Sequence, residues 1–307
     1  MEIIKIYFTN NWGEDDTKFL KRMKTTTQNN SGVWNKIHFT NDIQDANYIL
    51  SLGGLPNIKF RSYLNEKNLI ILQREPDILS VFNEYNIENS FSYKRLYHTW
   101  THPEHMQMNY DDFNSLKYDG LIKIKKCSTI TSMRLHSPLA RQRVNFITKL
   151  CEKYPNMIDV YGEGWDNRLG SSYKGELKWH NLGGFKRQKS DNENENESKY
   201  DGLKNYNYSL CFENSSYDNY FTEKFTDCIL SWTIPIYFGC LNIDKYFPSD
   251  SYYIVDINNI DNIDKVIEIM NRPITEKNIE ALKEARELIL NKYNIWPTLE
   301  SIVEKKL

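Results

Sequence analysis

Several features are missing from this sequence, and each absence argues against one class of protein. No apolar run approaches the roughly 20 residues of a membrane-spanning helix, and residues 69–72 are typical of its short apolar runs. The first residues lack the basic region and long apolar core of a signal peptide. Lysine and arginine (39) do not outnumber aspartate and glutamate (41), so the basic excess of a general nucleic-acid binder is absent. The five cysteines form no CxxC pair, which favours reduced thiols in a cytoplasmic protein.

The composition is that of an ordinary globular protein. With 307 residues, 40% of them hydrophobic and 26% charged, the chain is long enough for about two domains. Short apolar runs alternate with segments of helical length, a pattern typical of βαβ units and parallel sheets. The predicted strands are 2–8, 46–52, 68–73, 126–131, 158–161, 208–212 and 234–238, and the clearest predicted helices are 137–151 and 222–232.

Two α/β halves with a cleft between them are the simplest assembly of these elements. We expect an N-terminal domain at 1–120, a C-terminal domain at 121–275, and a C-terminal helix within 276–307 that packs near the domain interface. Residues 91–119 show no clear period and are predicted as irregular chain. Residues 186–199 are rich in Asn, Glu and Lys, so they are predicted as a solvated loop with too little apolar surface to fold.

The segment after the strand at 208–212 carries the most specific chemistry. Thr222 is placed to cap the helix at 222–232, which buries residues 225, 228, 229 and 232 on one face. Its first turn therefore lies at the carboxyl edge of the sheet, where free backbone N–H groups favour a phosphate. Lys224 in this turn is unfavourable beside the positive end of the helix dipole, so we expect an external anion there. A solvated surface lysine is the alternative.

Two further charged residues are predicted near the same region. Arg143 begins the buried face of its helix, whereas Arg141 lies about 200° away around the helix axis and is expected to face solvent. A guanidinium at this place suits a diphosphate, with a structural ion pair as the alternative. Glu75 follows the strand at 68–73, so its carboxylate points into the cleft and is a candidate general base. A salt bridge to Arg74 is the alternative.

These motifs, in this order, resemble the signature of the α1,3/4-fucosyltransferases of glycosyltransferase family 10. The signature is present as F-E-N-S at 212–215, Y-F-T-E-K at 220–224 and P-I-Y-F-G at 235–239. The similarity extends back to Arg143 and D-V-Y-G at 159–162, and forward to Y-F-P at 246–248. In the N-terminal half it rests mainly on R-E-P at 74–76.

The resemblance implies a GT-B architecture, in which two Rossmann-like domains face a central cleft. It implies an inverting transfer of L-fucose from GDP-fucose to a hydroxyl of a glycan acceptor, with α1,3 linkage to a GlcNAc-type residue. By position, Glu75 would be the general base, and Arg143 and Lys224 would stabilise the departing GDP. The donor would be bound by Arg143, Asn214, Tyr220, Glu223 and Lys224.

The acceptor contacts and the metal requirement follow from weaker signals. Sugars stack on aromatic faces, so Tyr93, Tyr97 and Trp100 are predicted acceptor contacts. Preorganised cations can stabilise the leaving group without a metal, and no Asp-x-Asp motif follows an apolar strand. The histidines at 98, 102 and 105 are interrupted by Pro103 and match no metal-ligand spacing. We therefore expect no obligatory metal or cofactor.

Two other functions remain open at the level of sequence. One is the same fold acting on another nucleotide-activated deoxysugar, because a phosphate clamp does not fix the sugar. The other is a carbohydrate-binding protein without turnover. The expected partners are GDP-fucose and an oligosaccharide or glycoconjugate acceptor, with no nucleic acid and no transmembrane segment.

Overall fold

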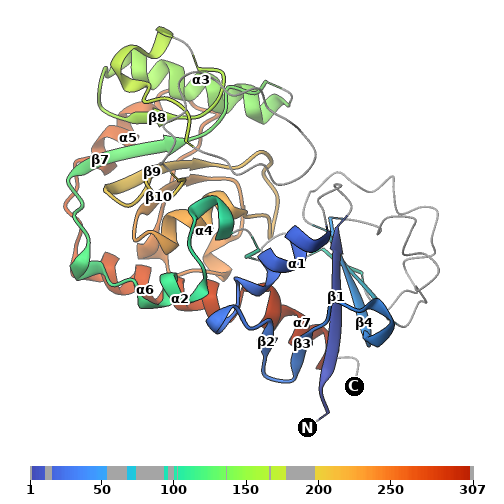
Figure 1. The fold of residues 1–307 in the computed structure, drawn as a ribbon. Helices are drawn as coiled ribbons and strands as arrows, with labels where there is room; N and C mark the ends of the chain where they lie inside the picture. The colour runs from blue at the N-terminus through green and yellow to red at the C-terminus, as the bar shows by residue number, and fades with distance from the viewer. Residues whose placement is uncertain are drawn as a thin grey trace.

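The computed structural model describes residues 2–10, 16–53, 68–73, 93–95, 100–101, 103–135, 137–165, 167–177 and 198–304. In this part of the chain the strands form two separate sheets, one in each half (Figure 1). The two sheets and the helices packed on them confirm the predicted α/β class with two Rossmann-like units, the GT-B type.

The N-terminal sheet is built around β1, which runs through its centre. Its strand order is β2-β3-β1-β4-β5-β6, and every pair is parallel except β2 with β3. Apolar side chains of β1, β4 and β5 are buried, as expected for strands covered on both faces. The strands are β1 (Ile4–Asn10), β2 (Val33–Trp34), β3 (Ile37–Phe39), β4 (Tyr48–Leu52), β5 (Leu69–Gln73) and β6 (Tyr93–Arg95).

The C-terminal sheet is wholly parallel, with the order β11-β10-β9-β7-β8. From β7 the chain moves outward to β8, and it then returns to place β9 on the other side of β7. This reversal makes a topological switch point at the carboxyl ends of β7 and β9, the place where open α/β sheets bind ligands. The strands are β7 (Lys125–Ile130), β8 (Asp159–Tyr161), β9 (Tyr206–Phe212), β10 (Ile234–Phe238) and β11 (Tyr253–Ile254).

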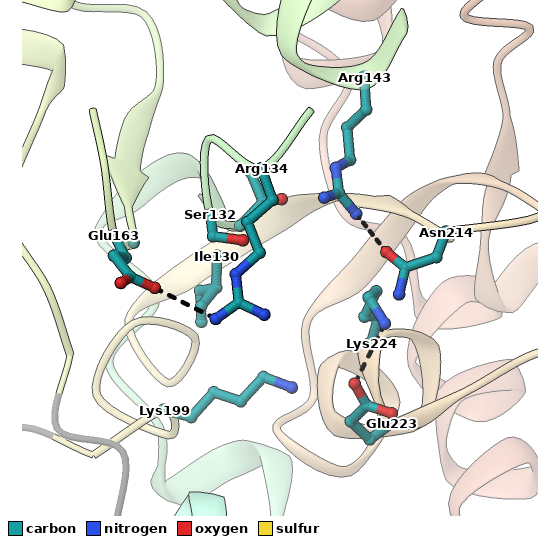
Figure 2. Close-up of a pocket in the computed structure, with 11 residues that line it drawn as sticks. Ile130, Ser132, Arg134, Arg143, Glu163, Lys199, Asn214, Glu223 and Lys224 are labelled. Carbon is teal, nitrogen blue, oxygen red and sulfur yellow. Dashed lines mark hydrogen bonds and ion pairs between the residues drawn. The ribbon is translucent and has the colours of Figure 1, made fainter. Parts of the chain in front are cut away.

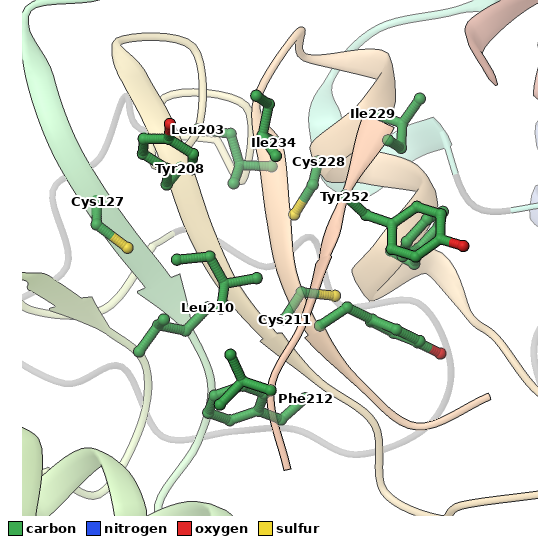
Figure 3. Close-up of a cluster of buried hydrophobic side chains, with 14 of the residues drawn as sticks. Cys127, Leu203, Tyr208, Leu210, Cys211, Phe212, Cys228, Ile229, Ile234 and Tyr252 are labelled. Carbon is green, nitrogen blue, oxygen red and sulfur yellow. The ribbon is translucent and has the colours of Figure 1, made fainter. Parts of the chain in front are cut away.

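Helices cover both faces of the C-terminal sheet, with α3 and α5 on one side and α4 and α6 on the other (Figure 1). Side chains of β9, β10 and α4 pack together in the core between the sheet and α4, where Cys211 and Cys228 are buried (Figure 3). The helices are α1 (Asp16–Lys24), α2 (Tyr110–Ser115), α3 (Pro138–Lys153), α4 (Glu223–Leu230), α5 (Asn262–Met270), α6 (Glu276–Asn291) and α7 (Ile295–Glu304).

The predicted strands and the two predicted helices are confirmed, with their ends within two residues of the prediction. The prediction of irregular chain over residues 91–119 is wrong at α2. This short helix is held by a capping box, in which Asn109 accepts from the backbone of Asp112 and the Asp112 carboxylate accepts from the backbone of Asn109.

The segment 276–307 contains two helices where a single one was predicted. Helix α6 packs on the C-terminal half, and α7 packs on the N-terminal sheet, beside β3 (Figure 1). The chain crosses between them at Asn294, which is fully buried and donates to the Thr26 backbone oxygen at 2.8 Å. The last helix thus completes the hydrophobic core of the N-terminal half.

Trp296 is the main anchor of α7. Its side chain is fully buried, with its ring centroid 5.1 Å from that of Phe8. Its indole Nε1 donates to the Thr26 hydroxyl at 2.8 Å and to the Met23 backbone oxygen at 3.2 Å. A large ring that also satisfies its polar atom contributes both burial and a hydrogen bond to the N-terminal core.

The length and polarity of the described helices show whether any of them could span a membrane. The longest helices among the described residues, α3 and α6, have 16 residues each and are amphipathic. Within the described part of the chain, none is long and apolar enough to cross a membrane.

We predict that Trp296→Ala lowers the free energy of unfolding by about 3–5 kcal/mol, because it removes a buried ring and leaves a cavity. Urea-induced unfolding followed by circular dichroism measures this change. The matched control is Ser301→Ala on the exposed face of the same helix, which should change stability by less than about 0.5 kcal/mol. Equal stabilities of the two variants would show that α7 does not anchor the N-terminal core.

Candidate functional site

The carboxyl end of β9 is fixed by a buried carboxylate, Glu213. This residue is fully buried, and its two carboxylate oxygens accept from the Thr222 backbone N–H at 2.8 Å and the Thr222 hydroxyl at 2.7 Å. Thr222 is the N-cap of α4, so Glu213 joins the strand end to the helix start. Burial raises the pKa of Glu213, and the nearby Lys224 ammonium opposes this shift.

Gly239 explains why the third motif ends in glycine. A Cβ atom at this position would lie 2.3 Å from Cγ of Glu213, which is far inside van der Waals contact. The backbone after β10 therefore passes directly over the buried glutamate, and only glycine permits that approach. The three sequence motifs thus meet around one carboxylate, although 26 positions separate Glu213 from Gly239.

Lys224 is held by acidic neighbours within the protein. Its Nζ lies 3.1 Å from the Glu223 carboxylate, 3.6 Å from that of Glu213, and 3.2 Å from the Thr222 hydroxyl oxygen. Burial alone would lower the pKa of Lys224, but Glu223 and Glu213 outweigh this effect and raise it. Internal carboxylates therefore offset the unfavourable helix dipole, so the dipole alone does not require an external anion at this lysine. Its side chain is 21% exposed, so one side of the ammonium still faces the pocket.

Arg143 is aimed at the same place from α3. Its side chain is almost fully buried, and Nη1 donates to the Asn214 side-chain oxygen at 2.8 Å and to the Phe212 backbone oxygen at 3.4 Å. Burial lowers the pKa of Arg143. Nε makes no hydrogen bond within the described residues, so this buried guanidinium keeps unused donor capacity. As predicted, Arg141 faces solvent.

The side chains of Arg143, Asn214 and Lys224 line one pocket of about 210 Å³ at the switch point of the C-terminal sheet (Figure 2). The loops after β7, β8 and β9 form its walls, together with the first turn of α4 and the buried face of α3. Its charged or polar side chains include Ser132, Arg134, Arg143, Glu163, Lys199, Asn214, Glu223 and Lys224. Four cations facing two carboxylates make the lining suitable for a multiply charged anion.

Four of the five predicted donor residues meet in this pocket, and Tyr220 does not. Arg143, Asn214, Glu223 and Lys224 all line it. Tyr220 belongs to the loop that leads into α4, but its side chain is fully buried and is not part of the lining.

The predicted residues of the N-terminal half are placed only in part. Glu75 and Tyr97 lie outside the described residues, and Tyr93 is described only as a residue of β6. Trp100 is 2% exposed, and its ring packs edge-on against Phe113 at 5.8 Å. The prediction that Trp100 stacks on an acceptor is therefore wrong, since the ring presents no open face.

Three charged residues of the lining were missed in the sequence. Lys199 was included in the loop predicted to be solvated, but it is buried and its ammonium pairs with the buried carboxylate of Asp227. Arg134 and Glu163 follow β7 and β8, the strands beside the switch point. The sequence did hold a sign of this, because both residues follow predicted parallel strands. The carboxyl ends of parallel strands lie along the same edge of a sheet, where ligands bind.

A family model and two relatives that match this chain all carry fucosyltransferase descriptions. A model of the family "Glycosyltransferase family 10 (fucosyltransferase) C-term" matches residues 122–282. The alpha-(1,3)-fucosyltransferase FucT of Helicobacter pylori is 37% identical over 81 residues, which are 26% of this chain and 16% of that protein. A putative fucosyltransferase-like protein of Arabidopsis thaliana is 34% identical over 73 residues, which are 24% of this chain and 14% of that protein. The chain therefore matches about a sixth or less of the length of these relatives.

Among solved structures, a crystal structure of an alpha1,3-fucosyltransferase aligns with a TM-score of 0.47 and 18% identity, covering 95% of this chain and 92% of that one. A complex of an alpha1,3-fucosyltransferase with GDP-fucose aligns with a TM-score of 0.43 and 17% identity, covering 95% and 82%. The family model spans more than half of the chain and all of the elements that build the pocket from β7 to α4. On that match, the chain belongs to glycosyltransferase family 10, the fucosyltransferase family.

Proposed function

We propose that this chain is an inverting fucosyltransferase, which moves L-fucose from GDP-fucose to a hydroxyl of a glycan acceptor, in α1,3 linkage to a GlcNAc-type residue. The observation that carries the proposal is the convergence of Arg143, Asn214, Glu223 and Lys224 on one pocket, in a member of a fucosyltransferase family. The pocket lies at the sheet edge where doubly wound folds bind nucleotides. Two relatives also carry fucosyltransferase names.

We assign the donor to the C-terminal half and the acceptor to the N-terminal half. In this assignment residues 121–275 bind the nucleotide sugar, residues 1–120 bind the acceptor, and residues 276–307 pack near the interface between them. All the residues that line the pocket lie in the C-terminal half, between Ile130 and Lys224. On the acceptor side, Tyr93 and Tyr97 remain proposed contacts.

The cations stabilise the leaving group. As the bond between the sugar C1 and the phosphate oxygen breaks, its electron pair stays with GDP, and negative charge grows on the diphosphate. The Arg143 guanidinium and the Lys224 ammonium are already oriented by Asn214, Glu213 and Glu223, so little reorganisation is needed when that charge appears. Preorganised charges of this kind lower a barrier by several kcal/mol in typical enzymes.

Glu75 is the proposed general base. It lies two positions after Gln73, the last residue of β5, at the carboxyl end of a parallel strand of the first sheet. Its carboxylate takes the proton of the acceptor hydroxyl, while the acceptor oxygen forms the new bond to C1. Attack on the face opposite the departing phosphate inverts the configuration at C1.

Replacing Arg143 should weaken the binding of GDP. Arg143→Ala removes a buried cation from the pocket, so we predict a loss of about 10- to 100-fold in GDP affinity by titration calorimetry, since a charge-assisted hydrogen bond contributes about 1.5–3 kcal/mol. The matched control is Arg141→Ala on the same helix, which should leave affinity unchanged. Arg143→Lys separates charge from geometry, because lysine lacks the planar fork. Wild-type affinity in a folded Arg143→Ala protein would remove this residue from the phosphate site.

Replacing Glu75 should separate chemistry from binding. Glu75→Gln keeps the shape of the side chain but cannot accept the acceptor proton at neutral pH. We predict that the rate of fucose transfer falls by at least about 100-fold while GDP affinity stays within twofold of the wild type. A transfer assay with radiolabelled GDP-fucose and calorimetry on the same preparation provide both numbers. Retained transfer would show that another group is the base.

A further inference from the structure

The pocket has two chemically different ends, which Figure 2 shows on opposite sides. One end holds Arg143 with Asn214 and Lys224 with Glu223, at the start of α4. The other end holds Arg134 and Glu163, from the loops after β7 and β8. If the diphosphate occupies the first end, as the proposed function requires, the rest of the nucleotide extends toward the second.

Backbone hydrogen bonds hold the loops that carry Glu163 and Arg134. The Thr131 backbone N–H donates to the backbone oxygen of Tyr161 at 2.9 Å, and the Met133 backbone N–H donates to the backbone oxygen of Glu163 at 2.8 Å. Gly162 allows this pairing, since a Cβ atom there would lie 2.1 Å from the Thr131 oxygen. The two side chains are therefore presented from a fixed edge and not from a free loop.

The charged groups of this pair are accessible to a ligand. The Arg134 side chain is 56% exposed and that of Glu163 is 41% exposed, with 3.4 Å between guanidinium nitrogen and carboxylate oxygen. An ion pair this exposed contributes little to folding stability. Because the pair adds little to stability, we look for its role in the pocket that both residues line.

An arginine beside a glutamate matches one edge of one nucleobase. Guanine presents the O6 acceptor, the N1–H donor and the 2-amino donor in a row along its pairing edge. A guanidinium only donates and an ionised carboxylate only accepts, so the two groups side by side complement that row. Adenine offers a donor where guanine has O6 and an acceptor at N1, which reverses the pattern. Uracil has a single N–H between two acceptors.

We propose that Glu163 and Arg134 form the base-recognition end of the donor pocket and select guanine. The Glu163 carboxylate accepts from N1–H and from the 2-amino group, and the Arg134 guanidinium donates to O6. This inference rests on the proposed function, because it takes the diphosphate to lie against Arg143 and Lys224. It adds a specificity-determining pair at a place that the diphosphate-binding residues do not reach.

Inosine diphosphate is the most direct probe, because it differs from GDP only in lacking the 2-amino group. A site that hydrogen-bonds this group should bind inosine diphosphate about 10- to 100-fold more weakly than GDP. Calorimetric titration of the full chain with GDP, inosine diphosphate, ADP and UDP measures the preference. In Glu163→Gln, GDP affinity should fall by about tenfold or more, because the amide nitrogen opposes a donor of the base. The ratio between GDP and inosine diphosphate should fall toward one.

Two controls make the outcome specific. Glu152→Gln is the same chemical change at an exposed ion pair on α3, outside the pocket, and should leave every affinity unchanged. Arg134→Ala should weaken GDP and inosine diphosphate equally, since both carry O6. If the wild type distinguishes GDP from inosine diphosphate and Glu163→Gln keeps that ratio, the assignment of Glu163 is wrong while the donor pocket stands. If no nucleotide binds the wild type, the proposed function itself fails.

Discussion

The architecture of the site depends on the burial of one carboxylate, Glu213. A fully buried charge is costly unless hydrogen bonds and a cation satisfy it, and here Thr222 and Lys224 do so. That requirement fixes the start of α4 against the end of β9 and brings the chain after β10 over the glutamate at Gly239. It also orients the Lys224 ammonium, whose remaining open side faces the pocket. Part of the sequence motif is thus a structural unit that holds a cation in place.

The topology of the second sheet decides what surrounds that unit. Because the order reverses at β7, the loops after β7, β8 and β9 converge on one edge, and each contributes a polar or charged side chain to the pocket. The helix that follows β7 adds Arg143 from the side. The pocket therefore combines a cation-rich end beside α4 with a more exposed end at Arg134 and Glu163, a division suited to a ligand with unlike ends.

Sequence patterns predicted the helices and strands that are determined by local apolar runs and caps. They failed where contacts between distant parts of the chain determine the structure. The buried parallel strands and α3, with its Ser137 cap, followed from apolar runs and capping. The division of the C-terminal segment did not, because the break at Asn294 is set by docking on the N-terminal sheet, although Pro297 near the start of α7 was a usable sign. Four of the residues predicted from the motifs to bind the donor line one pocket, but a motif does not show which of its side chains are buried and which line a pocket. Tyr220 is a motif residue whose side chain is buried away from the pocket, and Lys199 lines the pocket although it is the last residue of the low-complexity tract.

The central claim is that the pocket between β7, β9 and α4 binds a guanosine diphosphate sugar, and equilibrium binding to the purified chain tests it most directly. Titration calorimetry with GDP, GDP-fucose, GDP-mannose and UDP-galactose, each with and without EDTA, compares base, sugar and metal dependence in one experiment. The account predicts that GDP and GDP-fucose bind, that UDP-galactose binds much more weakly, and that EDTA changes none of these affinities. Absence of binding by every nucleotide would contradict it.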